Sequence, residues 1–177
     1  MIEMISEVRT RVEFDGGQLF ERFVRWDGAC TSFDELKKNM IYAQEHKVVS
    51  VRQVLVLNSG VEVSVPIHEA LNMLPDRTGV LVVFDKEPSK FSSAEAPWFF
   101  DFPNNAAIYN ADGTLRFQLH NPEGKGSYIG GVHSGAMPNH ADTLGVLVGT
   151  VGHDPEWLYL VDCNSPELIH TGKWIRY

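Results

Sequence analysis

The sequence predicts an α+β fold in which short antiparallel strands predominate and two helices lie in the first half of the chain. Three observations support this prediction. Apolar and polar residues alternate over many short segments, turn-forming residues separate those segments, and helical spacing of apolar residues occurs only in the first half. Helices confined to one part of a chain favour α+β over a regular alternation of strands and helices.

Two β-hairpins with a helix between them are predicted at the N-terminus. Segments 8–14 and 19–26 alternate in polarity on either side of an Asp-Gly-Gly turn, and segments 49–57 and 61–65 do so around Asn-Ser-Gly. Segment 33–46 carries apolar residues at helical spacing and follows a Ser-x-x-Glu capping box, in which each side chain bonds the other residue's backbone N–H. The first helix is therefore expected directly after the first hairpin.

A second, short helix is expected at 66–74. Proline suits the first helical position, and Ile67, Leu71 and Leu74 recur at helical spacing after it. The segment that follows, 79–85, reads GVLVVFD and is almost continuously apolar, which is typical of a strand buried on both faces. We expect this segment to be a central strand of a sheet.

A long connection, 86–105, follows the central strand and contains three prolines and a cluster of aromatic residues. Beyond it, Gly, Pro, Asn and Asp separate a hairpin from four further strands. The expected segments are 108–119 for the hairpin, then 127–133, 143–151, 156–162 and 168–177. Consecutive short strands of this kind predict a C-terminal antiparallel β meander.

Length and composition indicate one compact unit. The chain has 177 residues, of which 44% are hydrophobic, so we interpret 1–177 as a single domain in which a subdomain junction would fall near 86–104. No run of about 18 apolar residues is present, and acidic residues occupy the N-terminus where a secretory signal would be basic. We therefore expect no membrane span, a cytoplasmic location, and reduced thiols at Cys30 and Cys163.

The charge balance restricts the kind of partner. The chain has 23 acidic and 15 basic residues, which gives a formal net charge of −8. This excess disfavours nucleic acid and anionic membranes as partners, because binding to phosphates needs clustered cations. A basic protein is the expected partner instead.

One glycine-rich stretch contains residue types that bind transition metals. His133, His140 and Asp142 follow one another there, and two imidazoles with a carboxylate can hold such an ion. Their spacing does not bring the side chains to one side, as a helical i,i+4 or strand i,i+2 pair would. No nucleophile motif is present either. We therefore expect no metal, cofactor or catalytic residue, and a metal-assisted hydrolase using these three residues is the alternative.

The stretch APWFFDFP groups four aromatic residues around one aspartate. Such a segment either packs onto the core or forms a contact surface, because so large an apolar patch is not stable in water. In the second case Trp98, Phe100 and Asp101 would bind the partner, together with the carboxylates of Asp154 and Glu156 at the turn GHDPEW. Both interpretations stay open at this point.

The strings YNADGTLRFQL, WLYLVDCNSPEL and HTGKWIRY resemble immunity proteins of contact-dependent inhibition and related polymorphic toxin systems of bacteria. The resemblance covers about the last 75 residues, and the N-terminal 100 residues lie outside it. It implies a single-domain inhibitor, monomeric or weakly dimeric, that binds a cognate toxin such as a nuclease and has no activity or cofactor of its own. A third hypothesis is a structural or ligand-binding β module of a phage or secretion apparatus, which would be oligomeric.

Overall fold

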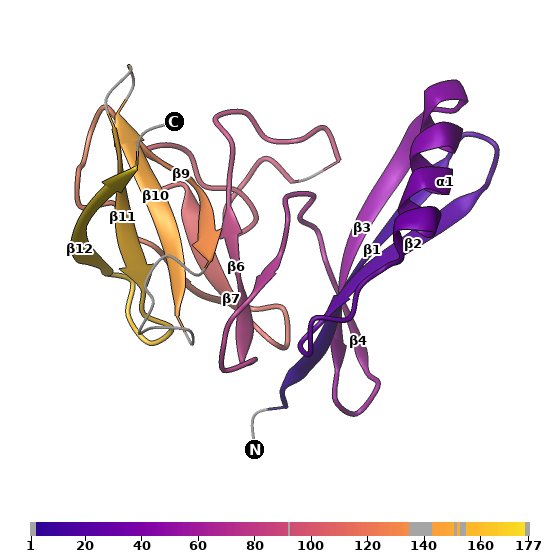
Figure 1. Ribbon diagram of the computed structural model, residues 1–177, viewed down its shortest axis with the longest axis horizontal. Helices are drawn as coiled ribbons and strands as arrows, with labels where there is room; N and C mark the ends of the chain where they lie inside the picture. The colour runs from indigo at the N-terminus through magenta and orange to yellow at the C-terminus, as the bar shows by residue number, and fades with distance from the viewer. Residues whose placement is uncertain (1–2, 92, 135–142, 151, 153–154, 176–177) are drawn as a thin grey trace.

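The computed structural model describes residues 3–91, 93–134, 143–150, 152 and 155–175. These residues form twelve strands and one α-helix, and the strands build three antiparallel sheets of four strands each (Figure 1). The fold is therefore largely β, and the predicted α+β class with two helices is corrected to one helix. The described part of the chain contains no helix with the length and apolar character needed to cross a membrane.

Both predicted N-terminal hairpins form, and they share one sheet because β1 pairs with β3. The strand order of this N-terminal sheet is β2-β1-β3-β4. Helix α1 (Phe33–Glu45) follows β2, and its N-cap is the predicted one, since Ser32 Oγ accepts a hydrogen bond of 3.2 Å from the Glu35 N–H. The strands of the sheet are β1 (Ile5–Phe14), β2 (Leu19–Arg25), β3 (Val48–Leu57) and β4 (Glu62–Val65).

The remaining strands form two meanders rather than one. The middle sheet has the order β5-β6-β7-β8, so the predicted hairpin after the long connection belongs to it, and the C-terminal sheet has the order β12-β11-β10-β9. The strands of the middle sheet are β5 (Asn72–Met73), β6 (Gly79–Val83), β7 (Ala106–Asn110) and β8 (Leu115–Gln118). Those of the C-terminal sheet are β9 (Ser127–Ser134), β10 (Leu144–Thr150), β11 (Glu156–Val161) and β12 (Leu168–Ile175).

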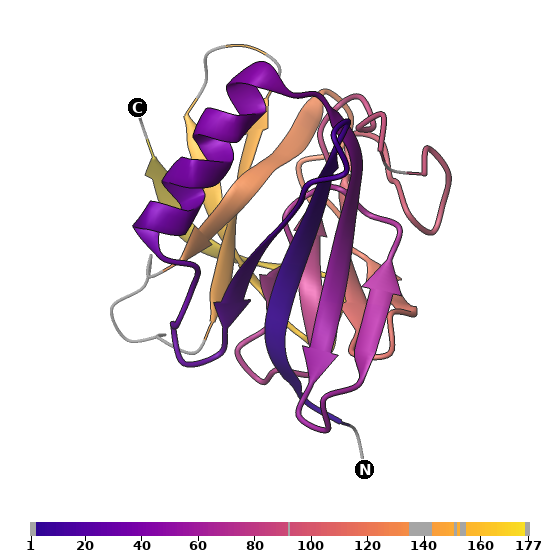
Figure 2. The same cartoon turned by 90° about the vertical axis from the view of Figure 1, so that its right-hand side faces the viewer.

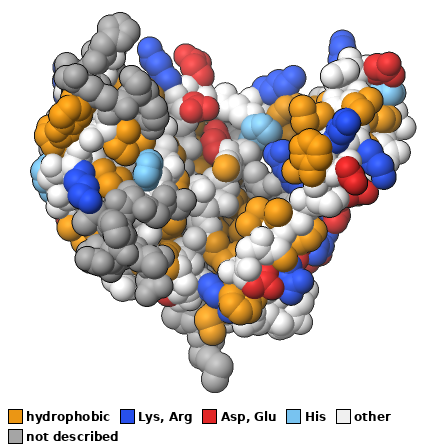
Figure 3. Space-filling view, viewed as in Figure 1, with side chains coloured by type: hydrophobic (Ala, Val, Ile, Leu, Met, Phe, Trp, Pro, Cys, Tyr) orange, Lys and Arg blue, Asp and Glu red, His pale blue; other side chains and the backbone are white. Residues whose placement is uncertain are grey.

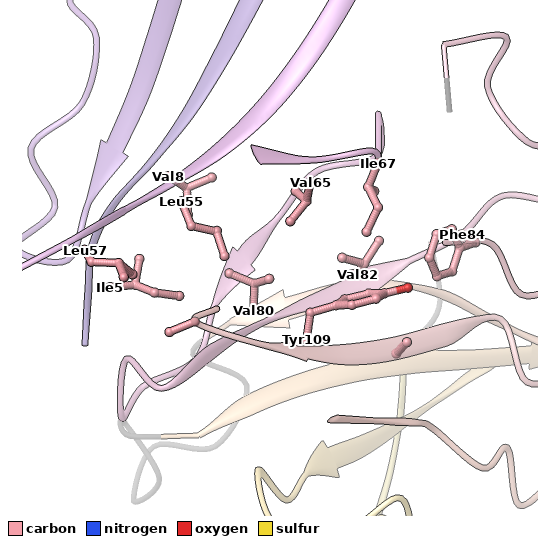
Figure 4. Packing of buried hydrophobic residues seen from close by; sticks show 12 residues of the cluster. Ile5, Val8, Leu55, Leu57, Val65, Ile67, Val80, Val82, Phe84 and Tyr109 are labelled. Carbon is pink, nitrogen blue, oxygen red and sulfur yellow. The ribbon is translucent and has the colours of Figure 1, made fainter. Parts of the chain in front are cut away.

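The three sheets stack as layers, with the middle sheet between the other two (Figure 1). Val80 and Val82 of β6 belong to a first core cluster shared with the N-terminal sheet, whereas Leu81 belongs to a second cluster shared with the C-terminal sheet. Figure 4 shows the first cluster, in which Val8 and other residues of the N-terminal sheet face the middle sheet. Because side chains alternate between faces, a strand covered on both faces is apolar throughout, which confirms the prediction for 79–85.

The predicted second helix, 66–74, is wrong. This segment is irregular, with bends at Pro66 and Glu69, and only β5 near its end is a strand. Ile67 is buried in the first core cluster and Leu74 in the second, so the chain has to pass from one layer to the other. The Gln53 side chain donates hydrogen bonds of 3.1 and 3.2 Å to the carbonyls of His68 and Glu69, which thus find partners without a helix. Tertiary burial here overrides local helical spacing.

Candidate interaction groove

The inner face of the N-terminal sheet is covered by two different elements. At one end, Val8 and Leu55 pack on the middle sheet in the first core cluster. At the other end, the Phe14 ring packs against Tyr42 of α1, with ring centroids 5.1 Å apart. Figure 2, in which the N-terminal sheet faces the viewer, shows α1 running along one side of this sheet. Between α1 and the middle sheet, no described residue covers the inner face.

This opening is a groove bounded by α1, β2 and segment 68–75. A cavity of about 430 Å³ contains Leu36 of α1 in its wall, and an adjoining cavity of about 610 Å³ continues toward Val132 of the C-terminal sheet. Volumes of this size are typical of ligand-binding clefts. The space-filling view shows the molecule hollowed here, with apolar side chains along the hollow (Figure 3). The two cavities share four residues in their lining, Val8, Val24, Ala70 and Leu71; with Leu36, these define the α1 groove.

The polar groups at the floor of the α1 groove bond to one another. Thr10 Oγ1 donates a hydrogen bond of 2.7 Å to Gln53 Oε1, and both side chains are buried. The Gln53 amide donates in turn to the carbonyls of His68 and Glu69. Because Thr10 and Gln53 bond to each other and Gln53 to these carbonyls, these two side chains do not need hydrogen bonds from a ligand.

The charged side chains of the groove all carry one sign. Apart from His68, the charged side chains that line it are those of Arg22 and Arg77. Arg25 also borders the cavity, but it pairs in register with Glu7 and alternates with Val24, so its side chain lies on the outer face of the sheet. Arg77 donates a 2.9 Å hydrogen bond to the Ile5 carbonyl and lies 4.7 Å from the centre of the Trp26 ring. The Arg25 guanidinium lies 4.0 Å from an Asp27 carboxylate oxygen, at the limit of an ion pair. Arg22 makes no side-chain hydrogen bond or ion pair with another described residue.

Large apolar residues extend the groove onto the surface of α1. Phe33 is 77% exposed and Met40 is 68% exposed, and no residue of α1 is fully buried. Both lie three or four residues from Leu36, so they are on the same side of the helix as this groove residue. On the opposite wall, Val24 and Trp26 of the β2 region are 58% and 56% exposed. We call Phe33, Leu36 and Met40 the α1 stripe.

The predicted partner-binding residues lie elsewhere. The Trp98 ring stacks on Tyr109 with centroids 5.6 Å apart, and Phe100 packs edge-on against Phe84 at 6.0 Å. Both aromatic residues are partly buried against the first core cluster, which corresponds to the core interpretation that the sequence left open. The structure does not bring them together with Glu156, which begins β11 in the C-terminal sheet.

Two carboxylates complete the predicted partner-binding set. Asp101 is exposed, and its carboxylate accepts a hydrogen bond from the Phe102 N–H. Asp154 lies outside the described residues. The part played by either carboxylate in binding stays a prediction.

The metal alternative stays a prediction. His133 lies on β9, whereas His140 and Asp142 fall outside the described residues. Within the described part of the chain, no three His, Cys, Asp or Glu side chains gather in a way that could hold a metal ion.

The two cysteines are not bonded to each other. Cys30 is exposed and lines the α1 groove, whereas burial raises the pKa of the partly buried Cys163 thiol. The two thiols should therefore differ in reactivity, with Cys30 the more reactive.

Sequence reasoning missed the α1 groove. The alternation that includes Val24 and Trp26 predicted a strand, and the helical spacing that includes Phe33 and Met40 predicted a helix, but neither pattern indicated that these side chains remain exposed. The signal that the sequence offered was the predicted helix. Its apolar stripe lies beside lysines, and such a stripe can pack on a core or bind a partner equally well. Arg22 and Arg77 are far apart in the sequence, so nothing local indicated that they share a groove.

No known protein family, curated protein or solved structure matches this chain. The function therefore has to follow from the geometry and charge of the molecule itself.

Proposed function

We propose that this chain is a protein-binding module that neutralises a cognate toxin, in the manner of the immunity proteins that its C-terminal strings resemble. The observation that carries the proposal is the α1 stripe beside the α1 groove. An apolar side chain that remains exposed on a folded helix gains free energy when a partner covers it, at about 25 cal/mol per Å² of apolar surface removed from water. Phe33 and Met40 have this character.

The net charge of −8 supports a basic toxin as the partner. A toxin that cleaves nucleic acid needs a basic cleft, and an acidic inhibitor is attracted to such a cleft over long distances, which speeds association by roughly 10 to 1000-fold. In this proposal Asp101, Asp154 and Glu156 contribute to steering, while the α1 stripe provides the apolar contact. The chain itself acts stoichiometrically, without cofactor, as a monomer or weak dimer.

The proposed site of action is the cytoplasm. The exposed Cys30 thiol suits a reducing compartment, because glutathione and thioredoxin keep such a group reduced there. Toxin delivered into the cell would meet the inhibitor in this compartment.

The test is binding to the toxin domain encoded beside this gene, measured by calorimetry and by protection of growing cells. A variant carrying Phe33→Ser and Met40→Ser should remain folded and lose on the order of 2 kcal/mol or more of affinity. Val61→Ser is the matched control, because Val61 is a 53% exposed apolar residue outside the α1 stripe and should bind normally. A neighbouring gene for a metabolic enzyme, or a double variant that binds with unchanged affinity, would contradict the proposal.

A further inference from the structure

We propose that the α1 groove receives an apolar peptide segment of the partner that carries carboxylates, and that Arg22 is the principal counter-charge. This inference rests on the proposed function and specifies the chemistry of the partner at one site. Charge then has two roles: the acidic net charge of the molecule attracts a basic partner over long distances, whereas the locally basic groove binds carboxylates of that partner.

Charge complementarity is the first argument. The chain has 23 acidic residues against 15 basic ones, yet no Asp or Glu occurs among the described lining residues of either cavity, whereas the side chains of Arg22 and Arg77 do. Arg22 has no ion-pair partner in the described part of the chain. Arg22 is exposed at the groove, and a ligand that covers it would strengthen its attraction to a carboxylate by excluding water from the pair.

The backbone pairing at the end of β2 determines how a ligand can bind in the groove. The segment after β2 folds back on it, so the Arg25 N–H donates to the Ala29 carbonyl at 2.8 Å and the Thr31 N–H donates to the Phe23 carbonyl at 3.2 Å. Val24 and Cys30 form an antiparallel bridge there. The backbone of this wall is thus already paired, which excludes the addition of a partner strand at this point. A ligand has to bind through side chains, as an apolar face laid into a groove does.

The spread of charge favours a peptide over a fatty acid. The Arg22 side chain lines the cavity next to α1, whereas that of Arg77 lines the adjoining one. A fatty acid has one carboxylate at one end and would pair with one of these positions, but a peptide can carry carboxylates along its length. Since Thr10 and Gln53 bond to each other, we infer that apolar burial and these arginines are the main binding determinants.

The experiment uses the full chain and two synthetic helical peptides with the same leucine pattern, one bearing glutamates and the other lysines. The glutamate peptide should bind more tightly and should protect Cys30 from alkylation, mapped by mass spectrometry, with Cys163 as the internal reference. Arg22→Glu should weaken its binding about tenfold or more, as expected for a partly desolvated charge pair, and Arg22→Gln by less. Arg52→Glu is the matched control, because this exposed arginine of β3 does not line the α1 groove.

The outcomes separate this inference from the proposed function. Equal or tighter binding of the lysine peptide, no protection of Cys30, or unchanged affinity in Arg22→Glu would overturn it. Tighter binding of dodecanoate than of the glutamate peptide would assign the groove to a lipid anion instead, and dimerisation lost in Arg22→Glu would assign it to a second copy. A toxin that binds the chain equally well with Arg22→Glu refutes the inference but leaves the proposed function intact. Failure of the toxin to bind at all refutes only the proposed function.

Discussion

The middle sheet and the N-terminal sheet have the same number of strands and the same antiparallel pairing, but their environments differ. The middle sheet is covered on both faces, and Val80, Leu81 and Val82 of its strand β6 are all fully buried. The N-terminal sheet is covered on one face only, and that cover is divided between the middle sheet and α1. The comparison shows that a sheet whose cover is divided between two elements has a groove between them, which no described residue of the chain fills.

The outer face of the N-terminal sheet contrasts with this groove. Arg11 Nε lies 2.7 Å from a Glu21 oxygen and Arg11 Nη2 lies 2.9 Å from a Glu62 oxygen, while Arg9 Nη1 lies 3.1 Å from Glu62. The hydrogen bonds from Arg11 lower the pKa of the Glu62 carboxyl and raise that of the guanidinium. These exposed charges satisfy one another, although such pairs add little to stability. Among the residues that the structure describes, none forms a comparable charge network on the inner face near α1, so this face is the better candidate for a partner.

The largest expected effect tests whether the middle sheet is the stable centre. Leu81→Ala should lower the free energy of unfolding by about 4 kcal/mol, because it removes a fully buried side chain and leaves a cavity. Met40→Ala should change it by no more than about 0.5 kcal/mol, as is usual for exposed sites. Urea denaturation of both variants measures the difference. Equal losses would mean that α1 is covered in solution and that the contrast between the two sheets is wrong.

A somewhat smaller loss is expected for Trp98→Ala, about 3 kcal/mol, because the ring is only partly buried where it stacks on Tyr109. Phe33→Ala is the control, since this aromatic residue is 77% exposed and should leave the melting temperature almost unchanged. Thermal unfolding of both variants measures this difference in melting temperature. A Trp98→Ala variant that melts normally but binds the toxin poorly would show that this segment is a contact surface rather than part of the core.

Gln53→Leu tests the link between the groove floor and segment 66–74. It removes the acceptor for Thr10 and the donor to the carbonyls of His68 and Glu69, so stability should fall by about 2 kcal/mol. Amide exchange in segment 66–74 should also become faster. Arg52→Leu, one residue away on the outer face of β3, should show neither change. Unaltered exchange in Gln53→Leu would show that burial of Ile67 and Leu74 alone holds the segment.

The smallest effect is confined to alkaline solution. Burial raises the pKa of Tyr109 above its usual range, and it does the same for Tyr159, whose hydroxyl also donates a hydrogen bond to Glu123. The unfolded chain releases these protons near pH 10, about the ordinary tyrosine value, while the folded chain retains them. The resulting stability is therefore fully present below about pH 10 and is lost as the pH rises through the folded pKa values. Unfolding measured on both sides of pH 10 should show this loss, reduced in Tyr109→Phe; an identical loss in that variant would contradict the assignment.

The local elements could be read from the sequence because local physics determines them. Strand β3, predicted at 49–57, begins one residue earlier, and α1 begins at its predicted capping box. The turns also follow from their residues, since Gly113 has a φ of 84°, a conformation that glycine adopts without strain. The candidate site could not be read in this way. Its wall residues Val24, Leu36 and Leu71 come from three separate elements, and their meeting depends on how the sheets stack.

The sequence by itself determined the alternation of the strands, the positions of their turns, the start of α1 and the acidic balance, because each depends on residues close together in the chain. Only the tertiary structure decided that β7 and β8 join the middle sheet, that 66–74 is not a helix, and that Phe33 and Met40 remain exposed. The physical reason is that burial is a property of the partners a side chain meets. Those partners are distant in sequence, so the same apolar spacing can be covered by the core or left open beside the α1 groove.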